Sequence, residues 1–175
     1  VAALRLRMAR LAGEKADGVL MNLVTPEYFG RAVEVVREGA RSAGRDPSDV
    51  TLATLVACSV SQDGEAAAVA VRRAVSNYVT LMPFYNKMLR DAGLVQEMDA
   101  IQPEVARLDV EAAAQKLSYD SVRSLGVFGT PQQAREGLKA YEKTPAELLV
   151  LIPYIPEGSD PVQSIADTIA AFAPR

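Results

Sequence analysis

The chain has 175 residues, of which 49% are hydrophobic and 23% charged, and its formal net charge at pH 7 is -3. The length suits one domain with a substantial core, no apolar run approaches the roughly 20 residues that span a bilayer, and the slightly acidic charge argues against a nucleic-acid-binding protein. The absence of histidine excludes Ser-His-Asp and Cys-His catalysis and the commonest zinc sites, and we expect no metal site.

The sequence begins with a strand–helix unit. Residues 18–22 predict a short strand, and the apolar residues 1–4 are a possible remnant of an earlier one. Thr25 is a good N-cap and Pro26 suits the first position of a helix, which we expect to end near Gly44. Because residue 1 is not methionine and no signal-peptide pattern is present, we expect the sequence to start in the middle of a protein.

The longest predicted strand covers residues 50–60, which are nearly continuous in apolar character. Such a strand is typical of a parallel sheet that helices cover on both faces. Cys58 lies within it, so we expect a buried and inert thiol, and a single cysteine fits a reducing cytoplasm. Residues 63–79 predict an alanine-rich helix, and residues 81–125 predict several short helices broken by proline and glycine.

The last part of the chain repeats the alternation of strand and helix. Thr130 and Gln133 have the spacing of a capping box, for a helix that runs to about Tyr141. Residues 147–152 predict a second fully buried strand, and residues 161–172 predict a closing helix.

This alternation predicts an α/β fold with parallel strands and outer helices. A complete (β/α)8 barrel of the TIM type needs about 250 residues. Three or four strand–helix units therefore make about half of one, and we expect residues 1–175 to form a single domain.

Three stretches resemble luciferase-like monooxygenases, particularly the deazaflavin-dependent branch of that family. They are LAGEKADGVLMN at 11–22, the segment 28–50 that ends in AGRDPSDV, and GVFGTPQQ at 126–133 followed by residues 148–153. Together they cover most of the chain in the order of the family. The resemblance implies that the chain is the C-terminal half of the barrel, with strands five to eight.

The resemblance also implies an oxidoreductase that acts on a small organic substrate by hydride transfer or monooxygenation. Its cofactor would be the deazaflavin coenzyme F-420, or alternatively FMN, held across the C-terminal mouth of the barrel, and the protein would bind and orient that cofactor. A second hypothesis is a non-catalytic truncated paralogue that binds flavin or a protein partner. An open nucleotide-binding domain is disfavoured because no glycine-rich phosphate motif follows a predicted strand.

In that family the loop after strand five helps to hold the phosphate of the cofactor. The matching positions are Ala3, Leu4, Arg5 and Arg7, and with Asn22 at a strand end they are our predicted cofactor-binding residues. A guanidinium holds phosphate through two parallel hydrogen bonds, but arginine stands where glycine is usual, which hinders close approach of the backbone. Alternatively, the arginines are solvent-exposed residues at the start of a helix, and the side chain of Asn22 hydrogen-bonds to local backbone. No catalytic residue is assigned.

A half-barrel has two sheet edges with unpaired backbone groups and an open apolar inner face. We therefore expect a homodimer or association with an absent N-terminal half, and an isolated chain without turnover. Alternatively, the irregular segment 81–125 folds back over one of these sheet edges, and no second chain is needed there.

Overall fold

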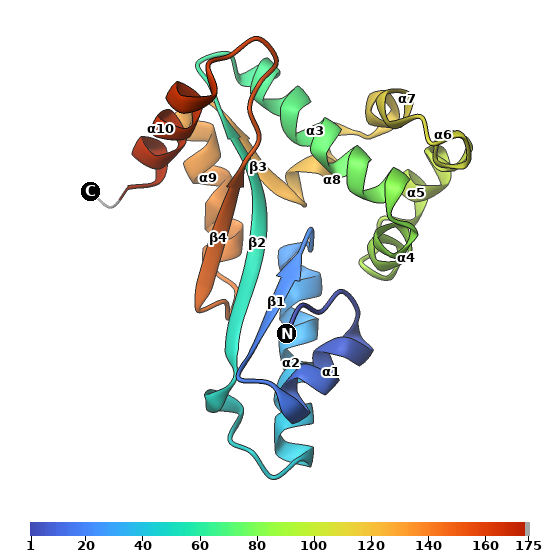
Figure 1. The fold of residues 1–175 in the computed structure, drawn as a ribbon, viewed down its shortest axis with the longest axis vertical. Coiled ribbons are helices and arrows are strands. Elements are labelled where there is room, and N and C mark those ends of the chain that lie inside the picture. Colours follow the sequence, from blue (N-terminus) through green and yellow to red (C-terminus); the bar gives the residue numbers. More distant parts are fainter. Residues whose placement is uncertain (174–175) are drawn as a thin grey trace.

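The computed structural model describes residues 1–173, in which four strands form a parallel sheet around one long central strand (Figure 1). The central strand β2 pairs with β1 through residues 51–55, with β4 through residues 53–58 and with β3 through residues 57–60. These registers place β1 and β3 on one edge of β2 and β4 on the other. The strands are β1 (Gly18–Asn22), β2 (Thr51–Val60), β3 (Gly126–Gly129) and β4 (Leu148–Pro153).

Two helices, α2 and α9, begin where the capping residues of the sequence predict. The Thr25 hydroxyl accepts a hydrogen bond from the Tyr28 N–H at the start of α2, and Thr130 and Gln133 form the predicted capping box of α9. The helices are α1 (Leu6–Lys15), α2 (Pro26–Ser42), α3 (Gly64–Leu81), α4 (Pro83–Asp91), α5 (Val95–Ala100), α6 (Gln102–Arg107), α7 (Val110–Lys116), α8 (Tyr119–Arg123), α9 (Pro131–Glu142) and α10 (Pro161–Phe172), with a 3-10 turn η1 (Pro47–Asp49). Within residues 1–173 no helix is long and apolar enough to cross a membrane.

The predicted strands at 18–22, 50–60 and 147–152 are confirmed as β1, β2 and β4, and they pair in parallel. The possible strand at 1–4 is reduced to one bridge between Ala2 and Leu20. β3 has no counterpart among the predicted strands, because four residues that begin and end with glycine are too few to show a pattern.

The two faces of the sheet are covered differently. On the outer face, Val56 and Cys58 of β2 are buried against Tyr141 of α9. On the inner face, the parallel registers align two rows of side chains across the strands: Leu20, Ala53 and Leu148 in one, and Asn22, Leu55 and Val150 in the next. The helices α2 and α9 lie behind the sheet in Figure 1, so the inner face is the one turned toward the viewer.

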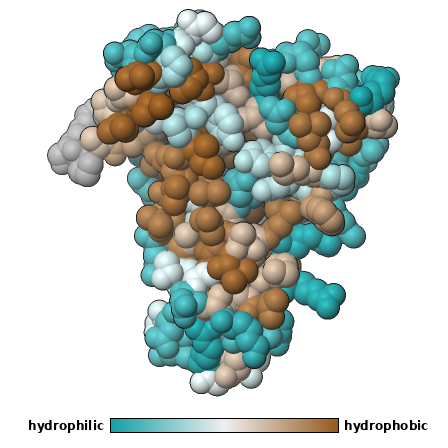
Figure 2. All heavy atoms as spheres, in the orientation of Figure 1, coloured by the Kyte–Doolittle hydropathy of each residue, from teal (hydrophilic) through white to brown (hydrophobic). Residues whose placement is uncertain are grey.

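The prediction that the strand at 147–152 is fully buried is wrong. Leu148 is 52% exposed, and the other residues of β4 are only half-buried. Figure 2 shows apolar side chains gathered over β4 on this open side of the molecule. The apolar composition of a strand indicates that its side chains are covered, but it does not indicate whether the covering residues belong to this chain.

The helices α1 and α2 cross at a distance that only glycine permits. A Cβ atom on Gly13 would lie 2.0 Å from the Val36 carbonyl oxygen, and one on Gly39 would lie 2.3 Å from the Arg10 carbonyl oxygen. Both opposing atoms belong to backbone, which cannot move aside like a side chain. The two helices therefore pack backbone against backbone at these two points.

The close contact between α1 and α2 predicts that replacing glycine by alanine changes the free energy of unfolding in opposite directions at two positions of α2. Gly39→Ala should lower the free energy of unfolding by about 1–3 kcal/mol, because the added methyl group overlaps backbone. Gly30→Ala should raise it by about 0.5–1 kcal/mol, because a Cβ at Gly30 meets nothing within 4 Å and alanine favours a helix. Urea unfolding of the two variants measures both values, and equal effects would contradict the close crossing.

Candidate functional site

Four polar and aromatic side chains meet at the C-terminal ends of the strands, and we call them the strand-end cluster: Asn22, Tyr78, Tyr85 and Tyr154. Asn22 ends β1, and its side-chain amide donates a 2.9 Å hydrogen bond to the Tyr85 hydroxyl on α4. The rings of Tyr85 and Tyr78 lie 4.8 Å apart, inclined by 54°. Tyr154 follows β4 directly, and its backbone N–H donates to the Cys58 carbonyl oxygen at 2.7 Å.

Two phenols of this cluster, Tyr85 and Tyr154, are held in their neutral form. Burial raises the pKa of Tyr85, although the hydrogen bond from Asn22 acts in the opposite direction. Burial, followed by the neighbouring Tyr78 hydroxyl, also raises the pKa of Tyr154. At neutral pH these groups therefore donate and accept hydrogen bonds but do not act as bases.

A second group, which we call the anion cluster, surrounds the start of α1: Arg5, Tyr28, Arg31 and Asp91. Nε and Nη2 of Arg5 lie 3.0 and 2.9 Å from Oδ2 of Asp91, at the end of α4. Arg31 on α2 donates a 2.9 Å hydrogen bond to the Asp91 carbonyl oxygen, and its guanidinium lies 5.2 Å from the centre of the Tyr28 ring. Two cations thus converge at a helix N-terminus that has no side-chain cap.

The hydroxyl of Tyr28 is an unsatisfied polar group within the anion cluster. The residue is 1% exposed, and among residues 1–173 no group forms a hydrogen bond of good geometry with its hydroxyl, the nearest backbone donor being the Leu6 N–H at the start of α1. Burial raises the pKa of Tyr28 and the Asp91 carboxylate raises it further, while Arg5, Arg31 and the backbone N–H of Leu6 oppose the shift. A buried hydroxyl without a partner is costly, so this group is available to a ligand atom that reaches the start of α1.

The predicted cofactor-binding residues fall in three places. Ala3 is buried, and its N–H donates to the Leu20 carbonyl oxygen at 3.0 Å, while Leu4 is half-buried against the core. Arg7 is exposed on the outer side of α1, where it borders a shallow groove with Met8, Arg10, Leu11 and Glu14. These residues are not brought to one point.

Arg5 and Asn22, in contrast, are bridged by a single helix. Arg5 pairs with Asp91 at the C-terminal end of α4, and Asn22 bonds Tyr85 near its start. Sequence reasoning missed Tyr28, Arg31 and Asp91 of the anion cluster. The one available signal was the position of the first two in the opening turns of the helix that follows β1, since ligands of parallel α/β folds bind at such strand ends.

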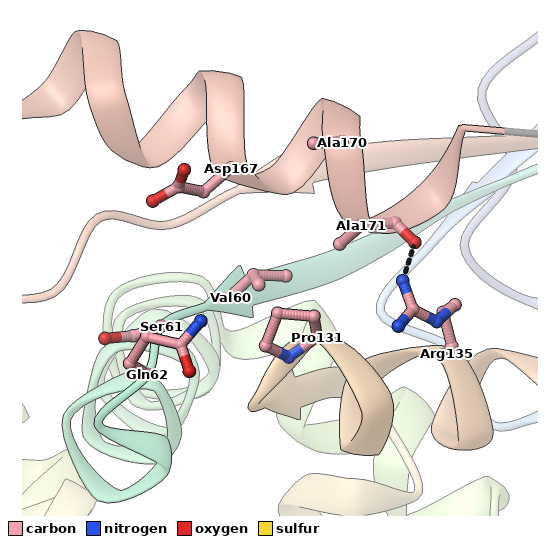
Figure 3. Close-up of a pocket in the computed structure, with 8 residues that line it drawn as sticks. All are labelled: Val60, Ser61, Gln62, Pro131, Arg135, Asp167, Ala170 and Ala171. Carbon is pink, nitrogen blue, oxygen red and sulfur yellow. Dashed lines mark hydrogen bonds between the residues drawn. The ribbon is translucent and has the colours of Figure 1, made fainter.

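Two cavities lie near the same ends of the sheet. One of about 190 Å³ lies between β2, α9 and α10, where Arg135 donates a 2.7 Å hydrogen bond to the Ala171 carbonyl oxygen (Figure 3). It is smaller than the roughly 300–1,000 Å³ typical of sites for cofactors and drug-sized ligands. The other, of about 370 Å³, is bounded by Tyr154 and by Arg73 and Asn77 of α3, and thus adjoins the strand-end cluster.

The chain is similar in sequence to members of a known protein family. Residues 1–148 match the family model described as luciferase-like monooxygenase. The chain is 34% identical over 131 residues to 5,10-methylenetetrahydromethanopterin reductase of Methanolobus tindarius, an alignment that covers 74% of this chain and 40% of that protein.

Solved structures show the same fold. The coenzyme F-420-dependent tetrahydromethanopterin reductase of Methanopyrus kandleri superposes with a TM-score of 0.73 at 22% identity, over 98% of this chain and 48% of that one. An F-420-dependent secondary alcohol dehydrogenase, solved with an F-420–acetone adduct, gives a TM-score of 0.67 at 18% identity, over 99% and 48%. The chain therefore spans less than half the length of these relatives, as expected for part of a barrel.

The buried position of Cys58 predicts an unreactive thiol. Burial raises the pKa of this thiol to about 12, so at pH 8 roughly one molecule in ten thousand would carry a thiolate, the reactive form. A disulfide-exchange reagent that releases a coloured thiol should therefore react with the unfolded chain in urea but not with the native protein over the same time. Rapid reaction of the native protein would contradict the placement of β2.

Proposed function

Because the chain belongs to the luciferase-like monooxygenase family, we propose that residues 1–175 form a single domain that supplies one half of a cytoplasmic barrel oxidoreductase using a flavin-type cofactor. Coenzyme F-420 is the proposed cofactor, since two similar proteins are described as dependent on it, and FMN is the alternative. The observation that supports this function best is the convergence of two polar clusters at the C-terminal ends of parallel strands, where (β/α)8 enzymes bind their ligands.

The residues of this chain fit such a cofactor at two points. The start of α1, the guanidinium groups of Arg5 and Arg31 and the free hydroxyl of Tyr28 suit an anionic tail. Asn22 and Tyr85 can bond polar atoms at the edge of a ring, and the apolar inner face beside them would exclude water. When bound, the cofactor supplies the hydride chemistry.

The same residues do not supply a general base. The chain has no histidine, and the raised pKa values of Tyr85 and Tyr154 keep both hydroxyls protonated near neutral pH. We therefore propose that this half binds and orients the cofactor and one side of a small-molecule substrate. Any general acid or base would come from the other wall of the barrel.

We propose that a second copy of this chain closes the open sheet. The helices at the two ends of the sheet both carry exposed apolar side chains: Met8 and Leu11 on α1, and Val162, Ile165 and Ile169 on α10. The α1 flank carries Arg7 and Arg10 beside one acidic residue, Glu14, which pairs with Arg10, whereas the α10 flank carries Asp160 and Asp167. A twofold axis would bring each flank against its complement and cover the inner faces of both sheets.

The cofactor proposal predicts binding without turnover. The isolated chain should bind coenzyme F-420, measured by quenching of cofactor fluorescence, and should neither reduce nor oxidise a substrate with it. Asn22→Ala should weaken binding about three- to tenfold, the value of one lost hydrogen bond. Gln115→Ala, at an exposed position on α7, is the matched control. Unchanged affinity in Asn22→Ala, or tighter binding of FMN, would count against the assignment.

The partner proposal predicts a dimer at twice the chain mass of 18.8 kDa. Sedimentation equilibrium at low micromolar concentration should find the dimer for the wild type, and Ile169→Asp should shift it to monomer because a charge enters an apolar contact. Val95→Asp, at a side chain that is 45% exposed on α5, should leave the dimer intact. A folded wild-type monomer, or association only with a separate N-terminal half, would contradict the proposal that the partner is a second copy of this chain.

A further inference from the structure

The anion cluster already contains an anion of the protein itself. One oxygen of the Asp91 carboxylate, Oδ2, accepts a 3.0 Å hydrogen bond from Nε of Arg5 and lies 2.9 Å from Nη2 of the same guanidinium. Its own backbone carbonyl accepts from Arg31. The two arginines that make the start of α1 attractive to an external anion are therefore both in contact with one residue of α4.

We propose that Asp91 determines which anions this site accepts, by occupying the ligand position on Arg5 until a stronger anion replaces it. This inference rests on the proposed function, in which the site holds the anionic tail of a cofactor. The ligand class that it selects is a phosphate dianion or phosphate ester, and the class that it rejects is a simple carboxylate.

The selection follows from charge and tethering. A carboxylate ligand offers Arg5 the same kind of oxygen and the same single charge as Asp91, but Asp91 is held in place by the chain and acts at a high effective concentration. A phosphate carries up to two charges and three acceptor oxygens. It can bind the first N–H groups of α1 and the free Tyr28 hydroxyl as well as Arg5, which a carboxylate in the same position cannot do at once.

The exposure of the pair allows such an exchange. The side chains of Arg5 and Asp91 are 40% and 42% exposed, so water can replace their bonds and the pair contributes little to folding. Asp91 is also the last residue of α4, the helix that carries Tyr85 to the strand-end cluster. Displacement of Asp91 would therefore free the end of α4 without unfolding the sheet.

The test is titration calorimetry of the 175-residue chain with inorganic phosphate and with acetate. In Asp91→Asn the phosphate affinity should rise about five- to twentyfold, the effect of removing one like charge about 5 Å away at a partly exposed site. Acetate should bind measurably to this variant and not to the wild type. Asp91→Glu, which restores the charge, should return both affinities toward the wild-type values.

Two controls separate this inference from the proposed function. Asp99→Asn removes a comparable carboxylate that pairs with Arg90 of α4, and it should change neither affinity. Arg5→Gln should abolish phosphate binding. Loss in Arg5→Gln together with unchanged affinity in Asp91→Asn would overturn the role of Asp91 and leave the anion site standing. Absence of phosphate binding in both the wild type and Asp91→Asn would overturn the site itself, and the role of Asp91 with it.

Discussion

The parallel pairing of three strands with β2 is the constraint on which the rest of the structure depends. β2 has ten residues because it must reach β1, β3 and β4 at staggered heights, and its backbone groups are used along both edges. Glu147 fixes one of these registers, since its backbone N–H and its carboxylate both bond Leu52. The strand ends, and with them the two polar clusters, are positioned by this ladder.

The sequence was informative where one stretch of chain determines its own structure. The strand at 50–60 and the capping box at Thr130 depend on nearby residues, and both are found. The burial of β4 was overestimated because it depends on what lies against its inner face. The anion cluster could not be predicted, since Asp91 belongs to a segment of short helices and meets Arg5 across 86 positions of sequence.

The segment that supplies Tyr85 and Asp91 to the two clusters is built from short helices. The helices from α4 to α8 have nine residues or fewer, a length at which isolated helices are marginal in water. They are held instead by contacts such as the buried Glu104 carboxylate, which pairs with Lys116 and Arg107 at 2.8 and 2.9 Å. A paired sheet beside a segment of low local stability is the arrangement expected where ligands must enter and leave.

The distance in sequence between β2 and β4 has a consequence for synthesis on the ribosome. Glu147 lies 95 positions after the residue that it binds in β2. At about 5–20 residues per second, the edge of β2 that receives β4 waits roughly 5–20 s after it emerges before its partner exists. During that interval a long apolar strand presents unpaired backbone groups, and an unpaired edge of this kind can pair with another chain.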